Sequence, residues 1–268
     1  MNETAERAYL AFDLGASSGR GILGFADAAG NVRLEEVHRF PNAPAVTPGG
    51  LYWDIDALFE NLLEAMRKVA RRGVVPRAVG VDTWGVDFAL LDATGQLLDR
   101  PRCYRDGRTA GLAERIAAQI GRQRLQQRGG SMLQDHASLC QLLAVKQHMP
   151  DLLAKAARLL FMPDLLRYWL CGGAEKGLAD PAAGTDITVA STSMAYDVPR
   201  RQWCAEILAE LGLPAGILPP VVVGPTVAGA LGEAVQKSTG LPAVPVVAGA
   251  GHDTGAAFGL CIPPLAGG

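Results

Sequence analysis

Three short segments of the sequence combine acidic or hydroxyl side chains with glycine, and each follows an apolar stretch. The first is Asp13-Leu-Gly-Ala-Ser-Ser-Gly-Arg20. Its glycines let the backbone bend close to a bound group, so that backbone N–H groups and hydroxyls can hydrogen-bond phosphate oxygens. Asp13 could hold a hydrated Mg²⁺, and Arg20 could face the same anion. The spacing alone is equally typical of a hairpin turn that Asp13 merely caps.

The second segment, Gly80-Val-Asp-Thr-Trp-Gly-Val-Asp87, has the side chains that a polyhydroxylated sugar needs. The carboxylates of Asp82 and Asp87 can accept hydrogen bonds from sugar hydroxyls, and the indole of Trp84 offers an apolar platform. Glycine at position 85 allows the backbone to approach a ligand closely. The alternative is a turn between two strands with Trp84 in the core.

The third segment, Gly251-His-Asp-Thr254, follows a short apolar run near the end of the chain. A carboxylate at the carboxyl end of a strand, beside the start of a helix, is a common catalytic placement in α/β folds. The N-terminus of that helix favours the ionised form of Asp253. The alternative is an aspartate that only caps the helix, and spacing alone favours that alternative.

The elements that position these segments alternate between strands and helices. Residues 9–13, 20–25 and 32–40 read as three strands with short connections, which predicts antiparallel neighbours. Asp54 is the expected N-cap of an amphipathic helix that ends near Gly73. Residues 78–81 and 88–91 read as strands, and Asp92-Ala-Thr-Gly95 as the hairpin turn that follows them.

The second half of the chain is expected to be mostly helical at first. Ser138 is predicted to cap a helix that ends at Pro150, and Pro163 to sit in the first turn of another. Short apolar runs at residues 159–162 and 244–248 predict strands, and residues 254–260 a helix. Strands interleaved with helices indicate an α/β layered domain. Neither Gly-x-Gly-x-x-Gly nor Gly-x-x-x-x-Gly-Lys-Ser/Thr occurs, so these two nucleotide-binding fingerprints are absent.

Composition narrows the class of protein. The chain has 268 residues, of which 49% are hydrophobic and 19% charged, as expected for a globular protein with a sizeable core. A net charge of -2 gives no reason to expect nucleic acid or an anionic membrane as a partner. No apolar run approaches the ~20 residues that span a bilayer, and a cytoplasmic location is the expectation. Five widely spaced cysteines predict buried thiols rather than a metal site or disulfides.

Taken together and in order, these segments resemble the FGGY family of carbohydrate kinases, and within it the rhamnulokinases. Asp13-Leu-Gly-Ala-Ser-Ser-Gly-Arg20 resembles the first phosphate loop of the family. The most specific matches are Val81-Asp-Thr-Trp-Gly-Val-Asp87 and Tyr104-Arg-Asp-Gly-Arg-Thr109. Gly251-His-Asp-Thr254 resembles the segment that holds the catalytic aspartate. The resemblance covers nearly the whole chain, and it favours the functional interpretation of each segment.

The resemblance implies a ribonuclease H-like, actin-like ATPase fold, with a mixed sheet flanked by helices. It implies ATP-dependent phosphorylation of L-rhamnulose at the C1 hydroxyl, with Mg²⁺ near Asp13 and with Asp253 as the general base. The implied phosphate loop comprises Gly15, Ala16, Ser17, Ser18, Gly19 and Arg20. The implied sugar contacts are Gly85, His252, Asp253 and Thr254, with Asp82, Trp84 and Asp87 as further wall residues.

Two departures from the family pattern leave alternatives open. Gln134-Asp-His-Ala-Ser138 stands where rhamnulokinases show an apolar stretch followed by Asn-Thr, so the sugar could be another ketose such as L-fuculose or xylulose. The chain also ends soon after the catalytic segment. We therefore expect a sugar-binding domain over residues 1–243, the start of a second domain at 244–268, and a missing C-terminal kinase domain. A non-catalytic sugar-binding module is the third interpretation.

Overall fold

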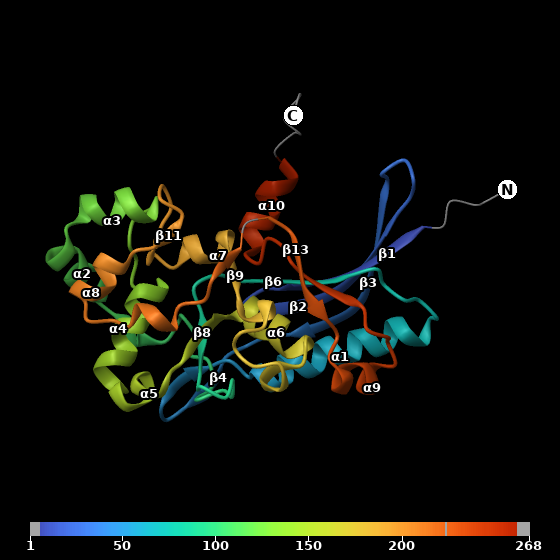
Figure 1. Ribbon diagram of the computed structural model, residues 1–268, viewed down its shortest axis with the longest axis horizontal. Coiled ribbons are helices and arrows are strands. Elements are labelled where there is room, and N and C mark those ends of the chain that lie inside the picture. The colour runs from blue at the N-terminus through green and yellow to red at the C-terminus, as the bar shows by residue number, and fades with distance from the viewer. Residues whose placement is uncertain (1–5, 223, 262–268) are drawn as a thin grey trace.

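A mixed sheet forms the centre of the molecule (Figure 1). The computed structural model describes residues 6–222 and 224–261, and within them six strands pair in the order β13-β14-β6-β1-β2-β3. Strands β1, β6 and β14 are parallel to one another, whereas β2 runs antiparallel to β1, β3 antiparallel to β2, and β13 antiparallel to β14. The strand bounds are β1 (Arg7–Leu14), β2 (Ser18–Ala26), β3 (Val32–Pro41), β6 (Val79–Thr83), β13 (Thr226–Ala230) and β14 (Pro245–Ala248).

Three helices cover one face of this sheet: α1 (Ile55–Arg71), α6 (Met162–Leu170) and α9 (Glu233–Thr239). The alternation of side chains along β1 shows why. Leu10 and Phe12 are buried beneath these helices, while Tyr9 on the opposite face is 39% exposed. The last helix, α10 (Asp253–Cys261), contacts β6 and lies on the opposite side of the sheet from α1 in Figure 1.

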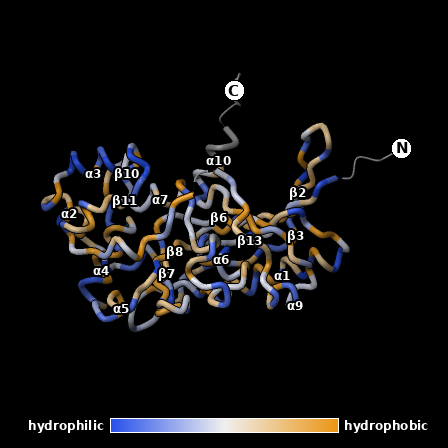
Figure 2. The backbone as a smooth tube through the Cα atoms, in the orientation of Figure 1, coloured by the Kyte–Doolittle hydropathy of each residue, from blue (hydrophilic) through white to orange (hydrophobic). Residues whose placement is uncertain are grey.

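A second lobe, mainly helical, packs around a short antiparallel pair of strands, β7 (Phe88–Leu91) and β8 (Arg158–Phe161). It has its own apolar core, in which Leu139, Leu159 and Ile207 are each almost fully buried. Figure 2 shows hydrophilic residues along α3, at the outer end of the lobe, and also at α5. The helices of this lobe are α2 (Leu112–Ile120), α3 (Arg122–Gly129), α4 (Ser138–His148), α5 (Pro150–Lys155) and α8 (Ala205–Glu210).

The remaining elements are short. They are β4 (Ala45–Thr47), β5 (Gly50–Tyr52), β9 (Thr185–Asp186), α7 (Ile187–Thr192), β10 (Tyr196–Asp197), β11 (Gln202–Trp203), β12 (Val221–Val222), and the 3-10 turns Gly107–Thr109, Gly173–Glu175, Pro181–Ala183 and Ala215–Ile217. No helix in the described part of the chain is long and apolar enough to cross a bilayer.

The predicted α/β class, with a mixed sheet and flanking helices, is confirmed. Asp54 caps α1 by accepting a hydrogen bond from the Ala57 N–H at 3.1 Å, and Pro163 lies in the first turn of α6. One cap prediction is wrong. Ser138 is the first residue of α4, its side chain does not cap the helix, and its hydroxyl instead donates to the Val86 carbonyl at 2.6 Å.

Strand β14 begins just after the predicted domain boundary between residues 243 and 244. Strand β14 pairs with β6 in the same sheet as β1, and Val246 is fully buried in the core beneath that sheet. The division of the chain into two domains at this boundary stays a prediction.

Candidate active site

The three segments with chemical side chains meet at one edge of the main sheet. Because β1, β6 and β14 are parallel, their carboxyl ends lie together, and loops that follow them converge there. Asp13 on β1 pairs in register with Asp82 on β6. Thr83, the last residue of β6, forms a parallel bridge with His252. His252 directly precedes Asp253. Thr83 and His252, 169 positions apart in sequence, are thus neighbours.

Electrostatics at this edge are dominated by carboxylates. Burial, together with the nearby charges of Asp13 and Asp253, raises the pKa of Asp82 to about 7. Arg20, on the neighbouring strand β2, forms an ion pair with Asp13 and partly offsets that rise. An acid that titrates near neutrality beside two other acids is the arrangement expected where a cation, or a proton in transfer, is to be held.

The loop between β1 and β2 lies at the same edge and is tied down by its backbone. The Gly15 N–H donates to the Ser18 carbonyl at 2.9 Å, which closes a tight turn. Buried Asn42 donates from its side chain to the Gly15 carbonyl at 2.8 Å, and from its backbone N–H to Ser17 at 3.0 Å. The sequence did not indicate Asn42, because its contribution depends on a contact 27 residues away.

The phosphate-loop residues differ in how much room they leave. Ser17 is exposed, and Ala16 and Ser18 are half-buried, so this turn is open to a ligand. A Cβ atom added at Gly19 would lie 2.3 Å from the Phe40 ring, so only glycine fits between β2 and the ring. The loop predicted from the sequence is therefore a close-packed turn whose outer side faces solvent.

Gly85 lies against His252, which lines a pocket. A Cβ atom added at Gly85 would lie 3.1 Å from the His252 ring and 3.2 Å from the Thr192 hydroxyl oxygen. The pocket has a volume of about 500 Å³, which is enough for a small sugar. Its lining includes Val86, Gln134, His136, Ser191, Thr192, Met194 and His252. Of these, His252 was a predicted contact, and Gln134 and His136 belong to the segment whose departure from the family pattern left the choice of sugar open. Thr192 was not a predicted contact.

Trp84 and Asp87 lie behind this pocket rather than in its wall. Trp84 packs against Trp53 with ring centroids 4.3 Å apart, and both indole N–H groups donate to Asp87 Oδ2, at 2.6 Å from Trp53 and 3.0 Å from Trp84. The Tyr104 N–H and the Gln141 side chain donate to the same carboxylate. Burial raises the pKa of Asp87, and these donors oppose the rise. Asp87 is 1% exposed and both of its carboxylate oxygens accept hydrogen bonds from the protein. It therefore stabilises the segment behind the pocket and does not face the pocket itself.

The turn before α10 is held by side chains from α7. Asp186 caps α7 through the Thr188 N–H at 2.6 Å, and its second oxygen accepts from the Gly251 N–H at 2.8 Å. The Thr188 hydroxyl accepts from the His252 N–H at 3.2 Å. Asp186 is 3% exposed and was not indicated by the sequence. These contacts fix the backbone directly before Asp253.

Asp253 is the first residue of α10, as the sequence predicted for a carboxylate at a helix start. Its Oδ1 accepts from the Thr254 N–H at 2.5 Å and lies 3.4 Å from His252 Nε2. The side chain of Asp253 is 42% exposed, so it is accessible to a substrate from the open side of the sheet. Thr254 is exposed beside it.

Among the described residues, no group of three or more His, Cys, Asp or Glu side chains is close enough to hold a metal ion by itself. A cation at this edge would therefore need further oxygen ligands from a substrate or water. Mg²⁺ typically binds in this way, through one or two carboxylates together with phosphate oxygens and water.

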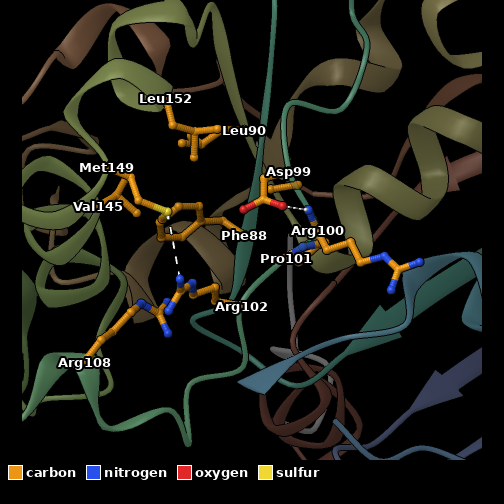
Figure 3. A pocket seen from close by; sticks show the side chains of 11 residues that line it. Phe88, Leu90, Asp99, Arg100, Pro101, Arg102, Arg108, Val145, Met149 and Leu152 are labelled. Carbon is orange, nitrogen blue, oxygen red and sulfur yellow. Dashed lines mark hydrogen bonds between the residues drawn. The ribbon is translucent and has the colours of Figure 1, made fainter. Parts of the chain in front are cut away.

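A separate cavity lies in the helical lobe (Figure 3). Its volume is about 30 Å³, room for one water molecule, and it is lined by Phe88, Leu90, Arg102, Arg108, Val145 and Met149 among others. None of the acidic residues Asp13, Asp82 and Asp253 lines this cavity, and it is too small for a sugar.

A model of the N-terminal domain of FGGY carbohydrate kinases matches residues 8–259, nearly the whole chain. The chain belongs to the FGGY family of carbohydrate kinases. This match confirms the resemblance inferred from the sequence segments, and it includes β14 and the start of α10 within the one domain.

Curated relatives of this FGGY kinase domain include rhamnulokinases. The chain is 39% identical to the rhamnulokinase of Bacteroides thetaiotaomicron over 257 residues, which cover 96% of this chain and 51% of that protein. It is 35% identical to the Enterococcus faecalis rhamnulokinase over 256 residues, with 96% and 49% coverage. The chain thus spans about half the length of the curated relatives it matches.

Solved structures of distant members share the fold. The gluconate kinase of Lactobacillus acidophilus superposes with a TM-score of 0.78 at 16% identity, over 92% of this chain and 48% of that one. The glycerol kinase of Plasmodium falciparum, solved with ADP, gives 0.72 at 18% identity, over 92% and 49%. At these identities the likeness establishes the actin-like kinase fold and nothing finer.

Proposed function

We propose that this chain is the sugar-binding half of an ATP-dependent kinase that phosphorylates L-rhamnulose at its C1 hydroxyl, a step of L-rhamnose breakdown. The observation that supports this most is the meeting of Gly85 and His252 at a pocket beside Asp82 and the Gly15 loop. The rhamnulokinases among its relatives support the choice of sugar.

In this proposal Asp253 is the general base. A sugar hydroxyl is a poor nucleophile at neutral pH, so a carboxylate aligned with the attacking oxygen is the expected aid. Asp253 stands at the N-terminus of α10, and its carboxylate accepts a hydrogen bond from the Thr254 N–H. The Asp186 and Thr188 contacts keep the preceding backbone in place while the proton is transferred.

The sugar occupies the pocket of about 500 Å³ in this proposal. Gly85 gives the sugar room beside His252, and Thr254 lies next to Asp253 at the open end. Thr192 is added to the predicted contacts because its hydroxyl reaches the same space. Trp84 and Asp87 hold the Gly85 backbone from behind rather than touching the sugar.

Phosphate groups of ATP are placed at the loop of residues 15–20, with Arg20 as the cationic partner. Asp13 and Asp82 fit a divalent cation, because their paired negative charges are costly without one and their oxygens are the ligands Mg²⁺ prefers. Mg²⁺ supplies charge neutralisation of the phosphates when bound. Since the family model matched is that of the N-terminal domain, we assign the adenosine to a second domain.

A kinase for another ketose, such as L-fuculose or xylulose, would keep all of this chemistry. The exposed His136 and Gln134 at the pocket are the observation that favours considering it, since both are polar groups that could select a hydroxyl. A sugar-binding module without catalysis would use the same pocket but not Asp253.

The test separates binding from catalysis. Calorimetric titration of the 268-residue chain with L-rhamnulose, L-fuculose and D-xylulose measures binding alone. For catalysis, the chain is continued with the second half of the Bacteroides thetaiotaomicron rhamnulokinase and assayed by ADP release. We expect selective L-rhamnulose binding, turnover by the chimera only, and a loss of about 10²–10⁴-fold in kcat for Asp253→Asn.

Other results would change the conclusion in defined ways. Preference of the chimera for a different ketose would replace L-rhamnulose and keep the kinase assignment. Unchanged turnover of the Asp253→Asn chimera would refute the general base. Absence of ketose binding together with an inactive chimera would refute the function as a whole.

A further inference from the structure

Two residues with strained backbones line the same pocket. Val86 has φ +70° and Met194 has φ +61°, in the left-handed region that non-glycine residues rarely adopt. Val86 is β-branched, for which this conformation is especially unfavourable. Both residues line the pocket beside His252. Such strain persists only where surrounding contacts enforce it, and it is concentrated at functional sites.

The first turn of α4 enforces both strained segments. The Ser138 hydroxyl donates to the Val86 carbonyl at 2.6 Å, and the Gln141 side chain reaches the same carbonyl at 3.3 Å. On the other side, the Leu139 N–H donates to the Ser193 carbonyl at 3.0 Å, directly before Met194. A single helix start therefore holds two walls of the pocket.

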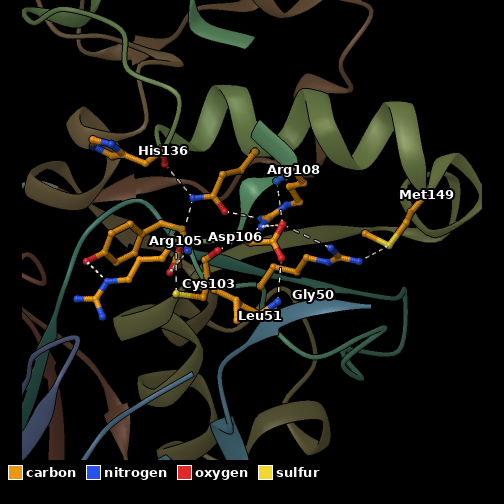
Figure 4. A network of polar contacts seen from close by, with 12 residues as sticks. Gly50, Leu51, Cys103, Arg105, Asp106, Arg108, His136 and Met149 are labelled. Atoms are coloured by element: carbon orange, nitrogen blue, oxygen red, sulfur yellow. Dashed lines mark hydrogen bonds and ion pairs between the residues drawn. The ribbon is translucent and has the colours of Figure 1, made fainter. Parts of the chain in front are cut away.

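Gln141 makes three of the hydrogen bonds behind this part of the pocket. Figure 4 shows Arg108 and His136, which belong to the same polar network. The Nε2 of Gln141 donates to Asp87 Oδ1 at 2.8 Å and to the His136 carbonyl at 3.0 Å, with Val86 as the longer third contact. His136 is itself a lining residue of the pocket. An amide nitrogen has two hydrogens, so the two shorter bonds dominate and the Val86 contact is shared.

The orientation of the Gln141 amide follows from Arg108. Arg108 Nη2 donates to Gln141 Oε1 at 2.6 Å, and because a guanidinium has donors only, the oxygen must face it. Arg108 is itself held by the Cys103 carbonyl and by Asp106, and its side chain is 8% exposed. The nitrogen of Gln141 is thus directed at Asp87 and His136 by a buried charge.

We infer that Gln141 is a positioning residue for sugar binding: it holds the Val86 backbone and the His136 segment as the two facing walls of the pocket. It is 1% exposed, so it does not contact the ligand and acts only through these walls. The inference rests on the proposed function for its ligand. It assigns a task to the buried network of Asp87, Gln141 and Arg108 that lies behind the predicted wall segment.

The test compares Gln141→Met, which keeps volume but removes every hydrogen bond, with Gln147→Met on the same helix, where the side chain is exposed. Calorimetry with L-rhamnulose is performed on the 268-residue chain, at a temperature where circular dichroism shows both variants folded. We expect Gln141→Met to weaken binding about tenfold or more and Gln147→Met to leave it unchanged. A purely structural role would not alter the affinity of a fully folded variant.

Hydrogen exchange measured by mass spectrometry keeps this inference separable from the proposed function. Gln141→Met should speed exchange in peptides that cover residues 83–91 and 131–138, whereas Gln147→Met should not. If the wild-type chain binds no ketose, the proposed function fails for this chain and exchange alone decides the positioning role. Unchanged exchange in both peptides, or unchanged affinity in a chain that binds the sugar, overturns it.

Should Gln141→Met fail to fold, Ser138→Ala tests how the Val86 carbonyl is held, because Ser138 donates the other side-chain hydrogen bond to that carbonyl. It removes the 2.6 Å contact to the Val86 carbonyl and leaves Gln141 in place. Faster exchange over residues 83–91 together with weaker sugar binding supports the inference that hydrogen bonds from α4 to the Val86 carbonyl position the pocket wall. Wild-type behaviour of Ser138→Ala in both measurements refutes it.

Discussion

Asp13 and Asp82 are register partners on the parallel strands β1 and β6, so their carboxylates project from the same face of the sheet. Arg20 is the cation paired with Asp13, and Asp253 adds a third acid at this edge. The result is a pKa for Asp82 of about 7, well above its ordinary value of 3.8. Protonation of one residue therefore reports on the geometry of the whole cluster.

The raised pKa of Asp82 predicts a specific dependence of stability on pH. The folded chain holds the proton up to about pH 7, while the unfolded chain releases it near pH 3.8. Stability from this proton is complete below pH 3.8 and is lost as pH rises through 7. Asparagine at position 82 does not ionise, so between pH 4 and pH 8 the free energy of unfolding of Asp82→Asn should rise relative to that of wild type. We expect a relative rise of about 1–3 kcal/mol, a range reduced because partial exposure screens the charges.

Urea unfolding of both proteins across that pH range measures the effect. Asp151→Asn, at an exposed position on α5, is the matched control and should stay parallel to wild type above pH 5. A constant difference between Asp82→Asn and wild type from pH 4 to pH 8 would show that the pKa of Asp82 is not raised.

Mg²⁺ should stabilise the chain through the same carboxylates. Binding needs their ionised forms, so the free energy of unfolding should increase by about 1.4 kcal/mol at a Mg²⁺ concentration ten times Kd at pH 8, and less at pH 5. Asp13→Asn should remove most of this increase, whereas Asp151→Asn should keep it. Thermal unfolding with and without MgCl₂, with CaCl₂ for comparison, measures it. An equal increase in Asp13→Asn would place the cation elsewhere.

The sequence predicted the site where chemistry and chain order coincide. Asp13, Asp82 and Asp253 each follow an apolar strand, and parallel strands bring such residues to one edge. Asp186 and Gln141 could not be found in this way. Each acts through hydrogen bonds to residues more than 50 positions away, and nothing in the local spacing indicates such partners.

The same limit explains the differences at Asp87 and Ser138. The family resemblance implied Asp87 as a wall residue of the sugar pocket, but its carboxylate accepts hydrogen bonds from Trp53 and Tyr104, which come from other parts of the chain, and it is buried. Ser138 is of a residue type that often caps helices, but its hydroxyl donates instead to the carbonyl of Val86, 52 positions earlier in the sequence. The strands and helices were predictable because periodicity is local; the partners of these buried polar groups are not.

Gly85→Ala should reduce sugar affinity with little loss of stability. Gly85 has an ordinary backbone conformation, but its added Cβ would lie 3.1 Å from the His252 ring and would narrow the pocket. We expect ketose binding to weaken about tenfold or more, measured by calorimetry with L-rhamnulose. Gly216→Ala, where no heavy atom lies within 4 Å of the added Cβ, is the control and should bind like wild type. Full affinity in Gly85→Ala would mean that the sugar lies elsewhere.

Asp186→Asn should loosen the turn that precedes Asp253. The carboxylate of Asp186 accepts from the Thr188 N–H with one oxygen and from the Gly251 N–H with the other. Asparagine has one oxygen only, so an amide NH₂ must face one of these two N–H groups. The cost is about 1–3 kcal/mol of stability, typical of a buried donor left without an acceptor.

The functional effect of Asp186→Asn should fall on kcat rather than on sugar affinity, since Asp186 holds the backbone before the base and does not line the pocket. In the chimera, kcat is expected to fall about tenfold or more while the sugar Kd changes little, and exchange over residues 249–254 should accelerate. Asp180→Asn, which alters a similar cap at Ala182 away from the site, is the control. Loss of sugar affinity with unchanged kcat would show that the hydrogen bonds of Asp186 position the sugar-binding residues and not Asp253.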